Sequence, residues 1–296
     1  MRIGVDVGGT RVEAIALDET GRVLLRRGTP TGQGDYDATV GAIAGLVHAF
    51  EEELSLHGTV GVAIPGTVSP ASGLVKNARR AWLDGRPLER DLTDRLERTV
   101  RLATDAGCFT LSEARDGAGL GTRVVFGVLL GPGCRGGLVV DGRLIAGANA
   151  IAGEWGHNPL PWPEGQEWPG LPCHCGRRGC IETFLSESGL TGDHREVTGA
   201  ILEAPDILAR AEAGDAAALA TLTRYEHRLA RALAGLVNVL DPDVIVLGGR
   251  LASSSRLGEE VSQIWGRFAF SDKLVNRLRS PLHGESSGVR GAAFLW

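Results

Sequence analysis

The sequence predicts an α/β fold made of two related lobes, because two patterns of elements each occur twice along the chain. The first pattern is a set of short apolar strands joined by glycine turns, and it occurs at residues 3–24 and again at residues 124–144. The second is a long helix that leads into a strand ending in glycine, at residues 36–66 and 216–249. A duplicated lobe of this kind usually binds its ligands in the cleft between the halves.

The elements of the first half follow from apolar spacing and turn residues. Alternating short apolar runs and glycine turns within residues 3–24 predict a β-meander. From residue 36 to residue 54 the apolar positions recur at i, i+3, i+4 and i+7, which is the spacing of an amphipathic helix. A strand at residues 60–64 follows, and the turn Pro65-Gly66 ends it.

The second half is expected to repeat this order. Residues 124–130 indicate a strand, residues 131–137 a glycine turn and residues 138–144 the return strand. A helix at residues 216–240 then leads into a strand and a glycine pair at residues 244–249. Residues 158–172 are rich in Pro, Gly and Trp and are expected to form a loop.

The bulk composition limits the class of protein. With 296 residues, of which 43% are hydrophobic, the chain can bury a substantial core. A net charge of −5 offers no basic surface for a polyanion, so nucleic acid is not an expected partner. No apolar run approaches the roughly 20 residues of a membrane-spanning helix, and no signal-peptide pattern follows Met1. We therefore expect a cytoplasmic protein with no membrane partner.

Four residues of the kinds that bind metals cluster in the middle of the chain. The sequence has five cysteines, and Cys173, Cys175 and Cys180 lie within one short segment. With His157 they supply one nitrogen and three sulfur atoms, a set typical of a closed tetrahedral Zn²⁺ site. Four protein ligands leave no open position for water, so the site is expected to be structural. His174 is the alternative nitrogen ligand, and free thiols on a loop are the alternative to a metal site.

Three glycine turns are candidate phosphate or nucleotide sites. Asp6 precedes Gly8-Gly9-Thr10, where backbone N–H groups would approach a phosphate and Asp6 would hold Mg²⁺ through water. On these residues alone an ordinary hairpin turn is an equal alternative. Residues 131–136 match G-x-G-x-x-G, but a strand follows them instead of a helix, which excludes a dinucleotide fold and favours a phosphate-facing hairpin. Gly248-Gly249 would face the adenosine end of the nucleotide.

Three carboxylates are candidates for proton transfer or ligand binding. Asp105 follows a short apolar strand and begins a predicted helix, so helix capping is its alternative role. Glu154 and Glu182 flank the zinc ligands, and a metal there would fix their positions relative to each other. That placement favours ligand binding over a plain surface position.

Together these segments resemble the ROK family of bacterial sugar kinases and sugar-responsive repressors, and most closely its fructokinases. The resemblance covers essentially the whole chain, and its most specific part is the zinc segment, residues 157–180. It implies an actin-like ATPase (ribonuclease H-like) fold with duplicated lobes, residues 1–115 and 116–296, and with the last helix packing back on the N-terminal lobe. The matching residues are 3–10, 61–66, 76–78, 153–162, 173–183, 241–249 and 287–293.

The resemblance also implies an activity and residue roles. It implies phosphorylation of a hexose by ATP, with fructose 6-phosphate as the first expected product and mannose or glucose as the next acceptors. Asp105 would be the general base that takes the proton of the attacking hydroxyl. Mg²⁺ would accompany ATP, Zn²⁺ would be structural, and a homodimer is expected. The implied sugar contacts are Gly66, Asn77, Thr104, Asp105, Glu154, His157 and Glu182, and the implied nucleotide contacts are Asp6, Gly8, Gly9, Thr10, Arg11, Gly131, Gly133, Gly136, Gly248 and Gly249.

Three positions depart from the family pattern. Thr104 stands where Asn is usual before the base, which removes one donor for the sugar. Pro132 interrupts a turn that usually reads Gly-Thr-Gly, which removes an N–H and a hydroxyl, and Arg135 places a long cation among small residues. These changes keep open a second function, a sugar-binding sensor or a weakened kinase.

Two alternatives involving nucleic acid are disfavoured. The family's repressors carry an N-terminal helix-turn-helix, and here the first phosphate strand begins at residue 3, so no DNA-binding domain is expected. A zinc-ribbon module would need a separate basic domain, whereas the zinc segment is embedded in an acidic chain.

Overall fold

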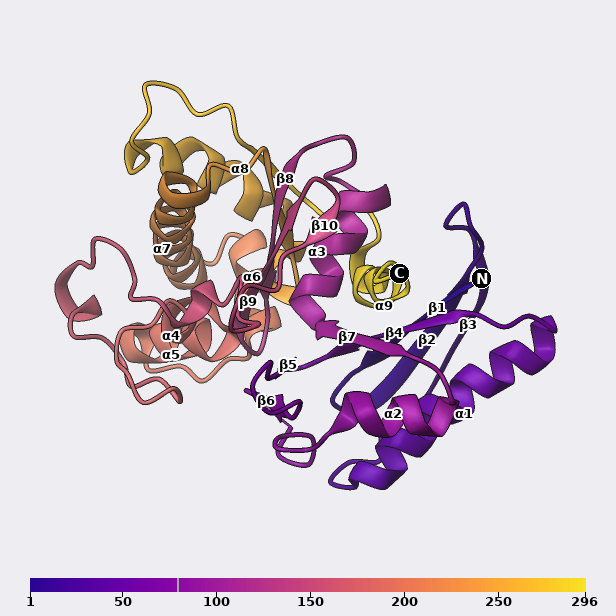
Figure 1. The fold of residues 1–296 in the computed structure, drawn as a ribbon. Helices are drawn as coiled ribbons and strands as arrows, with labels where there is room; N and C mark the ends of the chain where they lie inside the picture. The colour runs from indigo at the N-terminus through magenta and orange to yellow at the C-terminus, as the bar shows by residue number, and fades with distance from the viewer. Residues whose placement is uncertain (79) are drawn as a thin grey trace. The chain divides into compact units, whose positions relative to one another are not determined.

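Figure 1 shows the computed structural model of the protein, which describes residues 1–78 and 80–296. Over these residues the strands form two five-stranded sheets and one two-stranded ribbon. The chain divides into two compact units, and each is discontinuous in sequence. The first unit is residues 1–123, 137–153 and 282–296, and the second is residues 124–136 and 154–281.

A mixed five-stranded sheet forms the base of the first unit. Its antiparallel half consists of β1 (Arg2–Val7), β2 (Arg11–Leu17) and β3 (Val23–Pro30), which confirms the predicted meander. Its parallel half joins β1 to β4 (Thr59–Ile64) and β4 to β7 (Val100–Thr104). The carboxyl ends of β1, β4 and β7 therefore lie along one edge, where parallel sheets usually bind ligands.

Helix α1 (Tyr36–Leu54) packs against this sheet and has the bounds that its periodicity predicts. Asp35 caps it by accepting a hydrogen bond from the Ala38 N–H. Its buried side chains share one hydrophobic cluster with the inward residues of β1, among them Ile3, Val5, Val7, Ile43, Val47 and Phe50. The other elements here are β5 (Thr67–Val68), β6 (Val75–Lys76), α2 (Leu88–Leu96), α3 (Asp105–Asp116), β10 (Arg143–Leu144), η5 (Gly284–Ser286) and α9 (Ser287–Ala293).

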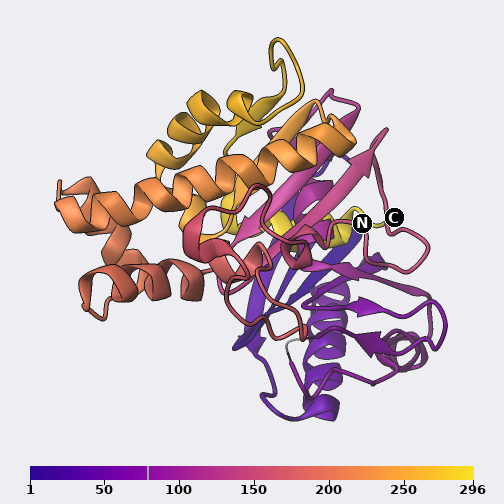
Figure 2. The ribbon, with the colours of Figure 1, turned by 90° about the vertical axis from the view of Figure 1, so that its left-hand side faces the viewer.

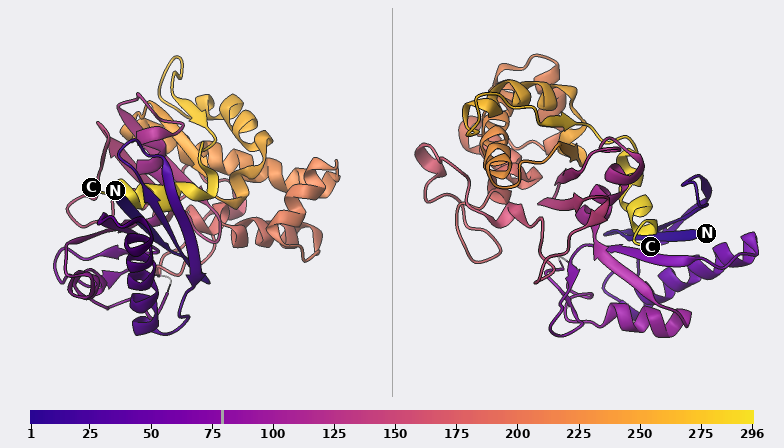
Figure 3. Two further views of the ribbon diagram at one scale, coloured as in Figure 1. Left: turned by 90° about the vertical axis from the view of Figure 1, so that its right-hand side faces the viewer. Right: turned by 45° about the horizontal axis from the view of Figure 1, so that its top comes forward.

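The C-terminal helix α9 lies beside the first sheet and against α3 (Figure 3). Side chains alternate along a strand, so Gly4 of β1 faces away from the α1 side. A Cβ at Gly4 or at Gly61 would lie 2.1 or 2.0 Å from carbonyl oxygens of α9, and a Cβ at Gly291 would lie 1.6 Å from the Cys108 carbonyl oxygen of α3. Glycine at these positions therefore lets the backbone of α9 touch both the sheet and α3.

Gly291→Ala is expected to destabilise the protein by about 1–3 kcal/mol, the usual cost of forcing extra atoms into a packed core. The new methyl group would overlap the Cys108 carbonyl oxygen. Gly45→Ala is the matched control, because Gly45 lies inside α1 and its Cβ position has no neighbour within 4 Å. That control should stabilise by up to about 1 kcal/mol. Denaturant melts measure both, and equal effects would contradict the packing argument.

A second five-stranded sheet contains the strands of the second unit. Its new strands are β8 (Val124–Leu130), β9 (Cys134–Val140), β11 (Val244–Gly248) and β12 (Arg277–Arg279). The strand order is β10-β9-β8-β11-β12, and β11 pairs parallel with both β8 and β12. The ends of β8 and β11 therefore lie next to each other.

The long helix α7 (Ala216–Leu240) also has its predicted bounds, and Asp215 caps it. Figure 2 shows this orange helix running alongside the other helices of the second unit. None of the helices in the described part of the chain is both long and apolar enough to span a membrane. The other elements are η1 (Trp155–His157), η2 (Gly165–Glu167), α4 (Glu182–Leu185), α5 (Glu187–Thr198), α6 (Ala204–Glu212), η3 (Arg250–Ser253), α8 (Ser255–Ile264) and η4 (Trp265–Arg267).

The glycine turn predicted at residues 131–137 is shorter than expected. The turn is confined to Gly131, Pro132 and Gly133, where the Gly131 N–H donates to the Gly133 carbonyl at 3.0 Å. Strand β9 already begins at Cys134. The later glycines of this stretch are strand residues that serve close packing, and a Cβ at Gly137 would lie 2.5 Å from Thr110 Oγ1.

The return strand predicted at residues 138–144 is also divided in two. Asp141 and Gly142 have φ values of 51° and 71°, both positive as in a type I′ hairpin turn. Arg143 then pairs back with Val140 in an antiparallel ladder. The Asp-Gly pair is itself a turn signal, and it outweighs the apolar pattern on either side.

Candidate functional site

In the first unit, two candidate carboxylates lie where the parallel strands of the sheet end. Asp6 is near the end of β1, and Asp105 directly follows β7. Burial raises the pKa of the Cys108 thiol well above its usual range, and the nearby charges of Asp6 and Asp105 raise it further. A Cβ at Gly288 would lie 3.1 Å from Asp6 Oδ2, so α9 also approaches this carboxylate closely. Asp6 and Asp105 therefore both lie near enough to Cys108 to affect its ionisation.

The residue that caps α3 is Thr104, not Asp105. Thr104 Oγ1 accepts a hydrogen bond from the Gly107 N–H at 2.9 Å. Asp105 is the first helical residue, and its Oδ1 accepts from the Ala106 N–H at 2.7 Å. The capping role considered for Asp105 therefore belongs to its neighbour, and the backbone orients the Asp105 carboxylate.

The first glycine turn follows β1 and is tightly closed. The Gly8 N–H donates to the Arg11 carbonyl at 2.9 Å. A Cβ at Gly9 would lie 2.1 Å from Arg80 Nη2, so a guanidinium that sequence analysis did not single out lies against this turn. The Arg11 guanidinium instead lies over Gly28 of β3, where a Cβ would be 2.1 Å from Arg11 Nε. The cation beside this turn is Arg80.

Two further sugar candidates flank the β5–β6 ribbon. Gly66 precedes β5, and Asn77 follows β6 with a φ of 58°. A Cβ at Gly66 would lie 2.9 Å from both the Lys76 carbonyl oxygen and the Ala78 Cα. Glycine at position 66 therefore allows the segment that carries Asn77 to approach the end of β4.

In the second unit, two glycine turns share one end of the sheet. Gly248 of β11 is paired with Leu129 of β8, so the turn at Gly131 and the turn at Gly249 start side by side. Gly249 has a φ of 92°, and a Cβ there would lie 2.2 Å from the Leu130 carbonyl oxygen. Gly136, also expected at the nucleotide, is instead a buried residue within β9 because the turn ends at Gly133.

Glu154 and Glu182 gather around the start of β9. The Cys134 N–H donates to Glu182 Oε2 at 2.9 Å. A Cβ at Gly156 would lie 2.0 Å from the Cys134 carbonyl oxygen, so η1, which follows Glu154, packs directly on this strand. Burial raises the pKa of the Cys134 thiol well above its usual range, with Glu182 and Glu154 adding to the rise and Arg135 opposing it. Both predicted carboxylates therefore lie beside the hairpin that β8 and β9 form, which we call the second hairpin.

The four predicted metal ligands also come together. The ligand atoms of His157, Cys173, Cys175 and Cys180 lie within 4.8 Å of one another. Cys173 Sγ is 3.6 Å from His157 Nδ1, and Cys175 Sγ is 3.6 Å from Cys180 Sγ. Zn–S bonds of about 2.3 Å give a tetrahedron with edges of about 3.7 Å, so this set fits a zinc ion.

A metal ion at this site would have to displace the proton of Cys180. Burial and hydrogen bonds with Cys175 and Cys173 raise the pKa of Cys180 to about 12. Without a cation this thiol would remain protonated at neutral pH, whereas metal ligation requires the thiolate. Binding of a cation between the sulfur atoms would therefore release this proton.

His174 contacts Glu182. Its Nδ1 lies 3.2 Å from Glu182 Oε1 and 3.9 Å from Cys173 Sγ. His157, His174 and Glu182 form a second group whose ligand atoms lie within 4.8 Å of one another. The two oxygens of Glu182 thus have different neighbours, the Cys134 N–H and the His174 ring.

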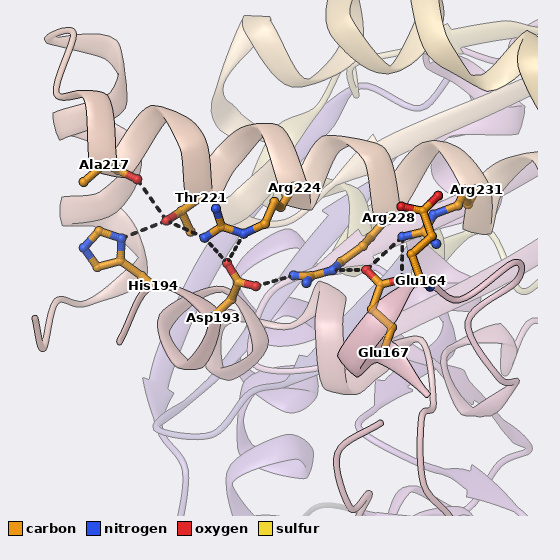
Figure 4. Close-up of polar contacts among 9 residues, drawn as sticks. All are labelled: Glu164, Glu167, Asp193, His194, Ala217, Thr221, Arg224, Arg228 and Arg231. Atoms are coloured by element: carbon orange, nitrogen blue, oxygen red, sulfur yellow. Dashed lines mark hydrogen bonds and ion pairs between the residues drawn. The ribbon is translucent and has the colours of Figure 1, made fainter. Parts of the chain in front are cut away.

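An ion-pair network ties the zinc segment to α7 (Figure 4). Glu167 of η2 accepts from Arg228 Nε at 2.8 Å and pairs with Arg231 Nη2 at 2.8 Å. Asp193 of α5 accepts from Arg228 Nη1 at 2.7 Å and from Arg224 Nη2 at 2.6 Å. The Glu167, Arg228 and Arg231 side chains are 10%, 12% and 3% exposed, so these charges neutralise one another in a largely buried setting. Arg224, Arg228 and Arg231 lie on one face of α7, but no short-range sequence pattern relates them to Glu167 or Asp193.

Glu167→Gln is expected to destabilise the protein by about 3 kcal/mol, because it leaves the buried Arg231 guanidinium without a carboxylate partner and leaves Arg228 with Asp193 alone. Burial alone would raise the pKa of Glu167, but hydrogen bonds from Arg228, the Glu164 N–H and Arg231 hold it below its usual value. A lowered carboxyl pKa stabilises the fold above the unfolded value of 4.5. That stability is lost as the pH falls through the folded pKa.

Urea melts at neutral and acidic pH measure this effect. The wild-type free energy of unfolding should fall more steeply below pH 4.5 than that of Glu167→Gln, since only the wild type has the titrating carboxylate. Glu196→Gln, an exposed change on α5, should leave both the stability and the slope unchanged. Parallel pH profiles for wild type and Glu167→Gln would contradict the assignment.

The two sheets and their glycine turns indicate the fold class of the protein. The actin-like ATPase fold contains two related sheets. Each opens with a meander and has glycine turns at the carboxyl ends of its strands. The sequence model of the ROK family matches residues 2–296, and the chain belongs to the ROK family. The family resemblance and the fold class expected from the sequence are thereby confirmed.

Comparison with individual proteins gives the same result. The chain is 36% identical over 299 aligned residues to an N-acetyl-D-glucosamine kinase from Salmonella gallinarum, covering 100% of this chain and 99% of the relative. It resembles the crystal structure of a ROK hexokinase from Thermus thermophilus, with a TM-score of 0.88, 27% identity and coverage of 99% and 97% of the two chains. It also resembles the crystal structure of a ROK family glucokinase from Streptomyces griseus in complex with glucose and AMPPNP. The TM-score is 0.81, the identity is 26%, and the match covers 99% of this chain and 98% of the glucokinase.

Proposed function

We propose that this ROK-family sugar kinase transfers the γ-phosphate of ATP to N-acetyl-D-glucosamine, with the 6-hydroxyl as the acceptor. The observation that carries the proposal is the full-length identity of 36% with an N-acetyl-D-glucosamine kinase. It replaces fructose, the acceptor first favoured from the sequence, because the named relatives are an N-acetyl-D-glucosamine kinase, a hexokinase and a glucokinase. Fructose becomes a comparison substrate.

Asp105 is the proposed general base. Its position at the carboxyl end of β7 supports this role, because ligands of parallel sheets usually bind at that edge. The Ala106 N–H holds one carboxylate oxygen at 2.7 Å and so limits rotation of the side chain. In the transfer, the attacking sugar hydroxyl would give its proton to this carboxylate while the oxygen–phosphorus bond forms.

The glycine turns are the proposed sites for Mg·ATP. Phosphoryl transfer requires mainly in-line positioning of the reactants and neutralisation of phosphate charge. The turn at Gly8, Gly9 and Thr10 and the turn at Gly131 and Gly133 would hold phosphates, and Gly248-Gly249 would face the adenosine. Asp6 would hold Mg²⁺ through water, since carboxylate oxygen suits this ion.

Two sets of residues remain the proposed sugar contacts. Asn77, Gly66 and Thr104 belong to the first unit, and Glu154, His157 and Glu182 belong to the second. A zinc ion bound by His157, Cys173, Cys175 and Cys180 would be structural, since it would hold the segment that carries the sugar contacts. Both oxygens of Glu182 have neighbours in the protein, which limits the orientations of its carboxylate.

Three earlier expectations stay predictions. They are the homodimer, the cytoplasmic location and the assignment of continuous lobes to residues 1–115 and 116–296. Closure of such lobes around ATP and sugar would exclude water and so limit wasteful hydrolysis.

The test is coupled ADP release from zinc-replete protein with Mg·ATP and a panel of N-acetyl-D-glucosamine, glucose, mannose and fructose. We expect the highest kcat/KM with N-acetyl-D-glucosamine. A clear preference for another sugar would overturn the acceptor assignment. Sugar binding by calorimetry without ADP release from any sugar would replace the kinase with the sensor, which Pro132 and Arg135 suggested.

A further inference from the structure

An exposed arginine is held at the second hairpin by a carboxylate. Arg250 Nε donates to Glu187 Oε1 at 2.9 Å, and Arg250 Nη2 donates to Glu187 Oε2 at 2.6 Å. The Arg250 side chain is 64% exposed and that of Glu187 is 18% exposed. The pair is therefore bidentate, with the carboxylate largely covered and the cation reaching solvent.

The pair connects the two glycine turns of the second unit. Arg250 directly follows Gly249, whose backbone touches the Leu130 carbonyl oxygen at the end of β8. Glu187 begins α5, and its N–H donates to the Gly131 carbonyl at 2.8 Å. A Cβ at Gly131 would lie 3.7 Å from Glu187 Oε1, so the carboxylate and its bound guanidinium lie directly beside the hairpin.

The hairpin itself has few backbone donors to offer a phosphate. The Gly131 N–H already donates to the Gly133 carbonyl, and the Cys134 N–H already donates to Glu182. Pro132 has no N–H at all. A phosphate at this turn would need positive charge from a side chain to replace the missing donors.

We propose that Arg250 contacts the phosphates of ATP beyond the α-phosphate, with Glu187 holding its guanidinium beside the hairpin. This inference rests on the proposed function, because it takes the hairpin to be part of the ATP site. A guanidinium presents five donors, which is more than one carboxylate can use, and the Arg250 side chain is 64% exposed beside Glu187.

The charge balance of the pair gives a specific signature. Without Arg250, the Glu187 carboxylate would face the phosphates uncompensated and would repel them. Arg250→Ala should therefore weaken ATP binding more than the loss of both charges does. Glu187→Gln alone removes a competing anion and should leave ATP binding equal or tighter.

The experiment is calorimetric titration of the full-length protein with Mg·ATP and with AMP, without sugar. Arg250→Ala is expected to raise the Kd for Mg·ATP about tenfold, as for the loss of a charge-assisted contact. The same variant should change the Kd for AMP little, because AMP lacks the outer phosphates. Arg250→Ala combined with Glu187→Gln should recover part of the loss, and Arg250→Lys should retain part of the affinity.

Controls separate this role from a structural one. Exposed ion pairs contribute little to stability, so Arg250→Ala should keep the wild-type melting temperature. Arg195→Ala removes another exposed arginine, about two turns along α5 from Glu187, and should not change the Kd for Mg·ATP.

Three outcomes would overturn the inference. An unchanged Kd for Mg·ATP in Arg250→Ala, beside normal sugar phosphorylation, would sink it and leave the proposed function intact. Equal weakening of ATP and AMP would assign Arg250 a merely structural role. A wild-type protein that does not bind Mg·ATP would remove both the inference and the proposed function.

Discussion

Asp105→Asn is expected to lower kcat for sugar phosphorylation by about a thousandfold, within the range for loss of a general base. Asparagine keeps the shape of the side chain, and its carbonyl oxygen can still accept from the Ala106 N–H as Asp105 Oδ1 does at 2.7 Å. It cannot take a proton from the attacking hydroxyl at neutral pH. The melting temperature and the Kd for sugar should therefore stay close to wild type.

Coupled ADP release measures the loss, and single-turnover mixing shows that it lies in the transfer step. Asp37→Asn is the matched control, because Asp37 is also an acid in the first turn of a helix of the same unit. It should retain wild-type kcat. An Asp105→Asn protein with more than about a tenth of wild-type kcat would be incompatible with general-base catalysis by Asp105.

Cys180→Ser is expected to abolish zinc binding under native conditions and to lower the melting temperature. Cys180 is 1% exposed and lies 3.6 Å from Cys175 Sγ, so no other sulfur can take its place without rebuilding the segment. Changes to residues that only support metal ligands weaken affinity about 10–100-fold, and loss of a ligand itself should exceed that range. Native mass spectrometry measures the bound metal directly.

Cys108→Ala provides the matched control for that experiment. Cys108 is as buried as Cys180 but lies in α3, outside the ligand group, so this variant should keep its zinc. Because zinc must displace protons from the thiols, wild-type zinc affinity should rise with pH. Full zinc occupancy in Cys180→Ser, or zinc affinity independent of pH, would refute the four-ligand site.

Local patterns predicted the long helices and the central strands well. Residues 36–54 and 216–240 are helices with the expected bounds, since apolar periodicity sets their buried faces and Asp35 and Asp215 cap them. The same approach failed at residues 131–144. There the glycines looked alike in sequence, but only Gly131 and Gly133 belong to the turn, and Gly137 is needed for packing instead.

The cluster of His157 with Cys173, Cys175 and Cys180 was also predictable, because the three cysteines share one short segment. His157 joined the set through its residue type and nearness in sequence, and the structure brings its Nδ1 to 3.6 Å from Cys173 Sγ. The sequence offered Asp105 as the possible cap of α3, whereas Thr104 caps this helix in the structure. A cap is decided by which oxygen meets the free N–H groups, and adjacent residues with similar side chains do not reveal this.

By itself, the sequence determined the fold class, the family and the bounds of the long helices, and it predicted the grouping of His157 with three cysteines, since each depends on residues close together in the chain or on a pattern repeated along it. Only the tertiary structure decided which charges meet. Arg250 pairs with Glu187, Glu167 pairs with Arg228, and Arg80 lies over Gly9. These partners are far apart in sequence, and their contact depends on how sheets and helices pack, which no local periodicity or turn signal encodes.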